Sequence, residues 1–273
     1  MNDKTYKIVI DENCIKIKQL YWDIAFGLQE VDGLKPSKYM IELSNEHING
    51  LKSYNQVQEA ITSYYSKNSD NHYDDDEEEA DVVSTAIYEI LSDKSFRFDY
   101  LTYKNYHKKL FQNLDNEVYH AGEFRIYNFT KDEPVLEGDT VDYQTWDLIE
   151  ESLKYDFDEE KSINYLEFDE EQFVERITEF TSRIWQIHPF CEGNTRTTAV
   201  FIQKYLISMG FDINNDLFKD KSLYFRNALV RANYINYAKG VKADNKYLKM
   251  FFGKLLFNKD CELNNDDLYI NNK

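Results

Sequence analysis

Apolar residues recur at helical spacing along most of the chain. The most regular run has apolar side chains four, three, four and three residues apart, at Phe173, Ile177, Phe180, Ile184 and Ile187. This spacing places them on one face of a helix. A second apolar helix is expected from Ala199 to Ile207, ending at Gly210. The same pattern predicts helices within residues 19–65, with a break at Asp32-Gly33 and a restart at Pro36-Ser37, and within 82–91 and 100–111.

Two segments have a pattern typical of extended structure. Residues 1–18 contain Ile8-Val9-Ile10, Ile15 and Ile17, which predicts one or two edge strands. Val135-Leu136 and residues 140–143 flank Glu137-Gly138-Asp139, which is typical of a β-hairpin. The fold class expected is therefore mainly α, with a β-hairpin and an N-terminal helical extension.

A polar stretch from Ser66 to Asp81 separates the helical regions. It contains six adjacent acidic residues, 74–79, which repel one another and offer no apolar face, so a solvated loop is expected. Calcium binding is the alternative, although the ligand alternation and turn glycine of an EF-hand are missing. The chain thus divides into an N-terminal extension (1–65), an acidic linker (66–81), a main domain (82–257) and a polar C-terminal tail (258–273).

Composition narrows the class of protein. The 273 residues include 32 Lys+Arg and 50 Asp+Glu, a net charge of −18, which argues against a nucleic-acid partner because phosphates repel a surface of like sign. Cys14, Cys191 and Cys261 are too far apart for a disulfide framework. No signal peptide and no run of 18 apolar residues is present, so a cytoplasmic protein without a membrane partner is expected.

The segment between the two most regular helices carries the candidate chemistry. The first helix is expected to end at His188, because proline disfavours helical geometry in the residue before it. Gly193 lets the backbone approach a ligand closely, and Asn194 is expected as the N-cap of the next helix. The free N–H groups of that helix and the guanidinium of Arg196 are suited to bind phosphate. Glu192 is placed to hold Mg²⁺.

His188, on the opposite side of this loop, is placed to accept a proton from an incoming hydroxyl. A phosphate site with a base directed into it is the outline of a phosphoryl- or nucleotidyl-transfer site. His107, by contrast, is expected on the surface of its helix.

The string His188-Pro189-Phe190-x-Glu192-Gly193-Asn194-x-Arg196 resembles the signature of the Fic (Fic/Doc) family. The resemblance implies an all-α core with the signature between two central helices, and transfer of AMP from ATP and Mg²⁺ to a Ser, Thr or Tyr hydroxyl of a target protein. It implies that His188 is the general base and Glu192 the Mg²⁺ ligand. Phe190 would anchor the loop, and the group around the α- and β-phosphates would be Gly193, Asn194, Thr195 and Arg196.

The resemblance implies further sites outside the signature. Gly122-x-x-Arg125 is similar to the lead-in to a flap, in which Val135, Leu136 and Val141 would clamp a target segment by strand addition. Phe225 and Asn233 fall where the family lines its adenine pocket. The alternative for these two is a buried aromatic residue and a polar residue of a helix.

Two positions depart from the family pattern. Thr195 stands where Gly or Lys is common, and Ala199 stands where many AMP-transferring members place a second arginine that contacts the γ-phosphate. The second departure leaves three functions open: AMP transfer, another reaction (removal of AMP, use of another nucleotide, or phosphate transfer), and binding without turnover.

Many members of the family are inhibited by a (Ser/Thr)-x-x-x-Glu-(Gly/Asn) helix whose Glu pairs with the second arginine. Thr85 and Glu89 have this spacing, but Ile90 does not fit, and Asp32-Gly33 has Asp in place of Glu. Residues 19–65 are similar to an antitoxin-type regulatory module, the alternative being a plain helical scaffold. Because Ala199 offers no arginine, the inhibitory pairing is expected to be lost.

Overall fold

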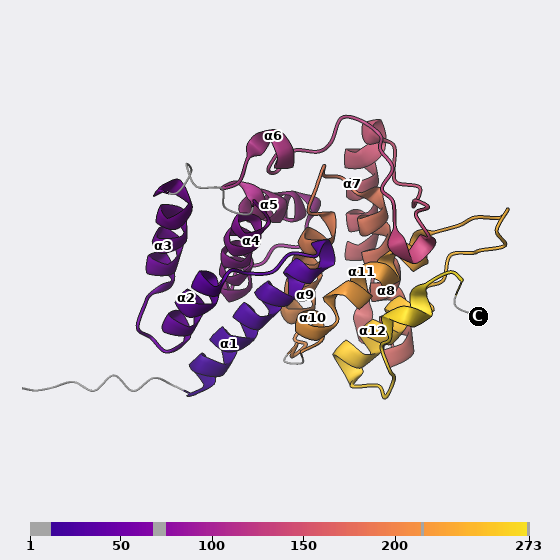
Figure 1. Ribbon diagram of the computed structural model, residues 1–273. Coiled ribbons are helices and arrows are strands. Elements are labelled where there is room, and N and C mark those ends of the chain that lie inside the picture. The colour runs from indigo at the N-terminus through magenta and orange to yellow at the C-terminus, as the bar shows by residue number, and fades with distance from the viewer. Residues whose placement is uncertain (1–11, 68–74, 214–215, 272–273) are drawn as a thin grey trace, which may run out of the picture.

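Helices make up nearly all the regular structure of residues 12–67, 75–213 and 216–271, the part of the chain that the computed structural model describes (Figure 1). The N-terminal half contains, with η for 3-10 helices, α1 (Glu12–Gly27), η1 (Leu28–Asp32), α2 (Lys38–Ile48), α3 (Tyr54–Lys67), α4 (Asp75–Ser92), α5 (Tyr100–Phe111), α6 (Asn116–Tyr119) and η2 (Pro134–Leu136). The remainder contains η3 (Trp146–Leu148), α7 (Ile149–Lys161), η4 (Tyr165–Glu167), α8 (Glu170–Ile187), α9 (Asn194–Ser208), α10 (Leu217–Asp220), α11 (Ser222–Asn233), α12 (Lys246–Phe257) and η5 (Asn265–Leu268). The prediction of a mainly α fold is confirmed.

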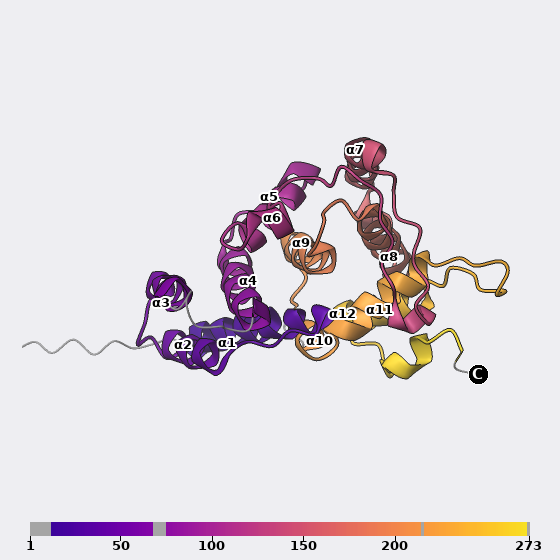
Figure 2. The same ribbon diagram turned by 45° about the horizontal axis from the view of Figure 1, so that its top comes forward.

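Helix α9 lies in the middle of the fold, surrounded by other helices (Figure 2). Its residues from Asn194 to Leu206 are all buried, and it packs against α5, α8, α4 and η1. The N-terminal helices therefore share one apolar core with the central pair α8 and α9. Among the described residues, no helix is both long and apolar enough to span a membrane.

Helix α8 forms as the apolar spacing predicts. Asp169 caps its first turn by accepting a hydrogen bond from the backbone N–H of Gln172, whose side chain bonds back to the backbone of Asp169. The five apolar residues of the predicted stripe, from Phe173 to Ile187, are all buried. The helix ends before Pro189, with His188 in the left-handed conformation at φ 48°.

The break and restart predicted in the N-terminal region are confirmed. Gly33 ends η1 with φ 76°, a conformation that glycine adopts without the steric penalty of a Cβ. Ser37 is the N-cap of α2 and accepts a hydrogen bond from the backbone N–H of Met40. Ser37 also donates from its backbone N–H (2.8 Å) and its hydroxyl (2.6 Å) to the buried Asp81. These bonds attach the chain that follows η1 to helix α4.

Two sequence predictions about the N-terminal region are wrong. Ile15 and Ile17 belong to α1 and not to an edge strand, whereas Ile8–Ile10 lie outside the described residues. The predicted acidic loop is helical from Asp75, so it does not form a linker up to residue 81. Carboxylates in the first turn of a helix interact favourably with its dipole, and the apolar residues that follow anchor α4 in the core. Asp74 lies outside the described residues.

The predicted β-hairpin does not form. Within the described residues the segment has one antiparallel bridge, between Glu133 and Asp139, and the 3-10 turn η2 between them. Pro134 begins that turn, and the adjacent Val135 and Leu136 both point into the core, which a strand with alternating faces cannot achieve. Val135, Leu136 and Val141 are at most 1% exposed, so their role as a target-clamping flap has no strand to support it.

The C-terminal residues, predicted as a polar tail, also contribute apolar side chains to the core. Leu263 and Leu268 are buried, and η5 packs against α11. The described part of this segment, up to residue 271, therefore covers one side of the helical core.

Candidate active site between helices α8 and α9

Arg125 fixes the end of α8. Its Nε donates to the carbonyl oxygen of His188 at 2.7 Å, and its backbone N–H donates to the carbonyl of Pro189 at 2.9 Å. The guanidinium also bonds the carbonyls of Tyr127 and Gln144. A cation at a helix C-terminus satisfies carbonyls that have no intrahelical partner. The predicted lead-in residue Arg125 thus determines where His188 projects.

The imidazole of His188 is enclosed by aromatic rings. Its centroid lies 4.1 Å from Tyr143, 5.2 Å from Trp185 and 5.6 Å from Phe129. Burial lowers the pKa of His188 well below its ordinary value, and the positive charge of Lys131 lowers it further. The ring is therefore neutral at physiological pH, as a general base must be. Its Nδ1 has no hydrogen-bond partner in the described part of the chain.

Asn194 holds the loop in shape and is not the N-cap that the sequence predicts. Its Oδ1 accepts from the backbone N–H of Phe190 at 2.9 Å, and its Nδ2 donates to the carbonyl of Phe190 at 2.8 Å. Because both ends of the amide are engaged in this ring, the cap position falls to Gly193, with φ 72°. A Cβ on Gly193 would lie 2.1 Å from Cζ of Phe111, so glycine is required here for its conformation and for its size.

His107 lies beneath the loop, and its predicted place on the helix surface is wrong. The ring stacks on Phe190 at 3.8 Å and 4°. Its Nδ1 accepts from the backbone N–H of Gly122 at 2.9 Å, so Nε2 carries the proton and donates to the carbonyl of Glu192 at 3.1 Å. Burial lowers the pKa of His107 to about 3. The helical spacing of Tyr103, His107 and Phe111 was a signal for this buried face.

Thr195 joins the two central helices. Its hydroxyl accepts from the indole Nε1 of Trp185 at 2.9 Å, which ties the first turn of α9 to the last turn of α8. The departure from the family pattern at this position therefore adds a contact within the protein.

The guanidinium of Arg196 is buried and points toward the N-terminal elements. Its Nη1 donates to Gln29 at 3.0 Å, its Nε lies 3.0 Å from an oxygen of Asp32, and its Nη2 donates to Glu79 at 2.5 Å. Position 199 offers no arginine, as the sequence shows, but Asp32 pairs with the arginine of the motif itself. Gln29 and Glu79 were missed, Glu79 because its acidic neighbours indicated a loop.

A cavity at the motif brings together six of the predicted site residues. It is lined by Asp32, Lys131, Glu133, Trp185, His188, Glu192, Gly193, Asn194, Thr195 and Arg226. Its volume is about 10 Å³, the space of one water molecule, so a nucleotide does not fit in this conformation. Lys131, Glu133, Trp185 and Arg226 were not predicted; they come from distant segments, and no motif marks them.

Phe225 and Asn233 do not line this cavity. Phe225 is fully buried against Phe218 and Phe251. The Oδ1 of Asn233 accepts from the hydroxyl of Ser182 at 3.1 Å. Both residues have the packing that the alternative interpretation describes, and an adenine-binding role remains a prediction.

Glu192 is suited to bind Mg²⁺ only together with a ligand that supplies further oxygens. Its side chain is 48% exposed at the cavity and lies 3.8 Å from Nζ of Lys131. In the described residues, no group of three or more His, Cys, Asp or Glu side chains is arranged to hold a metal ion. One carboxylate with phosphate oxygens and water is the usual environment of Mg²⁺ in nucleotide sites.

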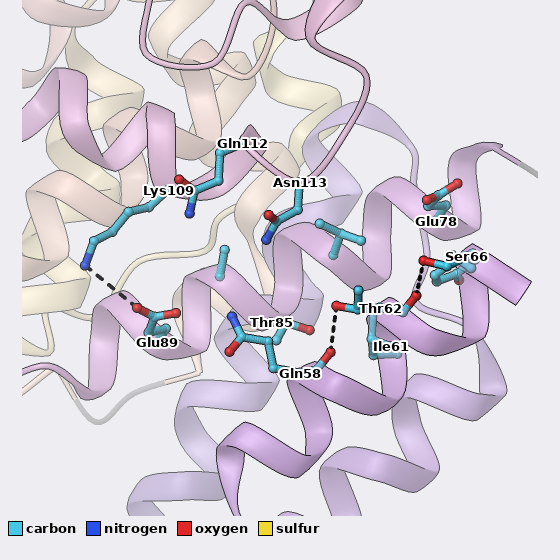
Figure 3. Close-up of a pocket in the computed structure, with 13 residues that line it drawn as sticks. Gln58, Ile61, Thr62, Ser66, Glu78, Thr85, Glu89, Lys109, Gln112 and Asn113 are labelled. Atoms are coloured by element: carbon cyan, nitrogen blue, oxygen red, sulfur yellow. Dashed lines mark hydrogen bonds and ion pairs between the residues drawn. The ribbon is translucent and has the colours of Figure 1, made fainter.

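Glu89 lies away from the motif, beside a larger cavity of about 550 Å³ between α3, α4 and α5 (Figure 3). Its carboxylate accepts a hydrogen bond from the hydroxyl of Tyr54 at 3.0 Å and lies 3.9 Å from Nζ of Lys109. None of the motif residues lines this cavity. Within the described part of the chain, the partners of the Glu89 carboxylate are thus Tyr54 and Lys109, and neither belongs to the motif.

Residues 97–206 match the model of the Fic/DOC family, which confirms the predicted resemblance over this segment. No curated protein matches the chain. Among solved structures, the chain is similar to the N-terminal FIC domain of Bep8, a VirB-translocated Bartonella effector protein from Bartonella sp. 1-1C. The identity is 22%, the match covers 64% of this chain and 81% of that chain, and the TM-score is 0.49.

Proposed function

We propose that this chain, whose residues 97–206 match the Fic/DOC family, transfers AMP from ATP to a Ser, Thr or Tyr hydroxyl of a target protein and releases pyrophosphate. The observation that carries the proposal is a buried, neutral His188 in the same cavity as the N-terminus of α9. A base and an anion-binding helix end are the two parts that such a transfer needs. We expect the reaction in the cytoplasm, where free thiols such as those of Cys14, Cys191 and Cys261 persist.

The proposed reaction follows from these positions. His188 accepts the proton of the target hydroxyl as its oxygen attacks the α-phosphorus. The bond from that phosphorus to the α–β bridging oxygen breaks, and its electron pair leaves with pyrophosphate. The N–H groups of the first turn of α9 stabilise charge on the α-phosphate, because they have no partner within the helix. Mg²⁺ held by Glu192 would neutralise the remaining phosphate charge.

The described conformation is, in this proposal, a resting state. Two features support it: the cavity holds only about one water molecule, and Asp32 and Glu79 occupy the guanidinium of Arg196. Displacing η1 from α9 would remove Asp32 and Gln29 from Arg196 and enlarge the cavity, and phosphate would then compete with Glu79 of α4 for the guanidinium. Residues 19–65 would then be a regulatory module acting through Asp32.

A second candidate is favoured by Ala199, which is fully buried and supplies no charge for a γ-phosphate. Without that contact the nucleotide can bind in another orientation, which would lead to phosphate transfer, use of another nucleotide or removal of AMP. A module that binds nucleotide without turnover is the third possibility.

One labelling experiment separates these functions. The chain and its His188→Ala variant are incubated with Mg²⁺ and ATP labelled at the α- or the γ-phosphate, and also with labelled UTP and CDP-choline. The same reactions are run with Asp32→Asn, to release the proposed resting state. AMP transfer predicts protein-bound α-label that His188→Ala abolishes, whereas γ-label alone indicates phosphate transfer. If no nucleotide labels the wild type or Asp32→Asn above the His188→Ala background, the transferase proposal is rejected.

A further inference from the structure

The motif helix does not direct a positively charged side chain into the cavity in the described conformation. Arg196 is held by Gln29, Asp32 and Glu79, and position 199 is alanine. The positively charged side chains that do line the cavity are Lys131 and Arg226. Lys131 lies beside Glu192, the proposed metal ligand, at 3.8 Å. This leaves Arg226, from α11, as the guanidinium in the described lining of the cavity.

Arg226 is held by a carboxylate in an incompletely bonded arrangement. Its Nη2 lies 2.7 Å from Oε2 of Glu133, whose side chain is fully buried. That Oε2 nevertheless has no hydrogen bond of good geometry to any described residue. Burial raises the pKa of Glu133, because it is unfavourable to keep a charged carboxylate away from water.

Three of the eight buried side-chain N and O atoms that lack a hydrogen bond of good geometry among the described residues lie in or beside the cavity. They are Nδ1 of His188, Oε2 of Glu133, which is ion-paired with Arg226 at 2.7 Å, and Nε of Arg196, which is ion-paired with Asp32 at 3.0 Å. Glu133 and His188 line the cavity directly, and Arg196 is paired with Asp32, which also lines it. Buried polar atoms without partners are rare in proteins, and Nδ1 of His188, which has none among the described residues, is free to bond a ligand in the cavity.

We propose that Arg226 binds the phosphate chain of the nucleotide and that Glu133 occupies its guanidinium while no nucleotide is bound. This inference rests on the proposed function and names the group that replaces the missing second arginine of the motif. A guanidinium donates two parallel hydrogen bonds to a phosphate as readily as to a carboxylate, so one can replace the other. The hydroxyl of Tyr143, 3.4 Å from Oε1 of Glu133, is placed to bond the displaced carboxylate.

A purely structural ion pair makes a different prediction. Glu133→Gln removes the charge that competes with phosphate and leaves Arg226 in place, so our proposal requires this variant to bind polyphosphate more tightly than the wild type. Loss of any carboxylate from the cavity also favours phosphate, so this gain is decisive only together with a loss of binding in Arg226→Gln. A structural pair does not predict that loss in a folded variant, because Arg226 would not contact the phosphate.

The test measures binding of ATP with Mg²⁺, and of inorganic tripolyphosphate, by calorimetry with the full chain. Glu133→Gln and Arg226→Gln are each introduced separately into the wild-type chain and into the Asp32→Asn chain, and each variant is compared with its own parent. Arg231→Gln is the control, since Arg231 lies on the same helix but donates to the carbonyl of Leu268, outside the cavity. We expect Glu133→Gln to bind at least about threefold more tightly than the wild type, and Arg226→Gln to bind about tenfold more weakly. Arg231→Gln should bind like the wild type.

The proposal is overturned if Arg226→Gln folds and binds like the wild type, if Glu133→Gln does not bind more tightly, or if neither the wild type nor Asp32→Asn binds either ligand. If Arg226→Gln does not fold, Arg226→Lys replaces it, and equal binding by Arg226→Lys and the wild type then overturns the proposal, because lysine cannot donate two parallel hydrogen bonds to a phosphate. Failure of the proposed function looks different. In that case binding depends on Arg226, but no His188-dependent label reaches protein. Conversely, His188-dependent labelling that is unaffected by Arg226→Gln rejects only the role of Arg226.

Discussion

Oδ2 of Asp32, the last residue of η1, lies 3.0 Å from Nε of Arg196 in the first turn of α9. The pair joins the N-terminal helices to the motif across more than 160 positions of the chain, and Asp32 also lines the cavity that holds His188. Any movement of η1 away from α9 must break this ion pair, so activity and the position of η1 are expected to be coupled.

The first prediction concerns this pair. Asp32→Asn combined with Glu79→Gln removes both negative charges from Arg196, and we expect at least about tenfold more label on protein, because the guanidinium becomes free to bind phosphate. The control is Asp23→Asn, since Asp23 pairs with Lys219 on the outside of α1. Equal labelling by the double variant and the wild type would contradict an inhibitory role for η1.

The second prediction concerns Gly193. Gly193→Ala is expected to destabilise the fold by about 2–5 kcal/mol, from the positive φ and from the collision with Phe111. Gly138→Ala is the matched control, because Gly138 has φ 83° but no atom within 4 Å of the place that a Cβ would take, and a loss of only about 1–2 kcal/mol is expected. Urea unfolding measures both. Adding Phe111→Leu should recover part of the loss at Gly193; equal losses at the two glycines would show that the collision is absent.

The third prediction is a pH dependence of stability caused by His107. Its pKa is about 3 in the folded chain and about 6.5 when unfolded, so below pH 6.5 the unfolded chain binds a proton that the folded chain excludes. Stability is therefore lost as the pH falls, by about 2 kcal/mol between pH 7.5 and 5 for this residue. His107→Phe lacks this effect. The free energy of unfolding of the wild type should thus fall relative to that of His107→Phe by this amount. If the difference between the two proteins does not change with pH, His107 binds a proton equally in the folded and the unfolded chain.

The fourth prediction concerns the pH dependence of activity. Burial first, and then the charges of Lys131, Arg125 and Arg226, keep the pKa of His188 well below its ordinary value. The base thus stays unprotonated when the pH falls from 8 to 6.5, and kcat/KM should stay constant over this range, within about twofold. If kcat/KM instead falls by half near pH 6.5, the pKa of His188 is not lowered in this way.

Local patterns predicted the parts of the site that depend on neighbouring residues. The stripe from Phe173 to Ile187 and the end of α8 at His188 follow from spacing and from Pro189. The partners of Arg196 could not be predicted in this way, because Gln29 and Glu79 are separated from it by 167 and 117 residues. Their pairing depends on packing of distant helices, which no local pattern encodes.

Two errors have physical reasons that a sequence alone conceals. The acidic run is helical because the apolar residues that follow it anchor α4, and a helix N-terminus accommodates negative charge. The segment around Val135 is a 3-10 turn because Pro134 and two adjacent buried side chains override the hairpin pattern. In both cases tertiary burial outweighs a local preference.

The contacts of Arg196 also limit how the molecule can be divided. A fragment holding only residues 97–206, the family-matched segment, would lose Gln29, Asp32 and Glu79 and leave a desolvated guanidinium without a counter-charge. It would also expose the sides of α9 that pack on η1 and α4. We therefore expect that the segment proposed to carry the chemistry does not fold on its own, and that the N-terminal helices must be retained wherever this motif is transplanted or dissected.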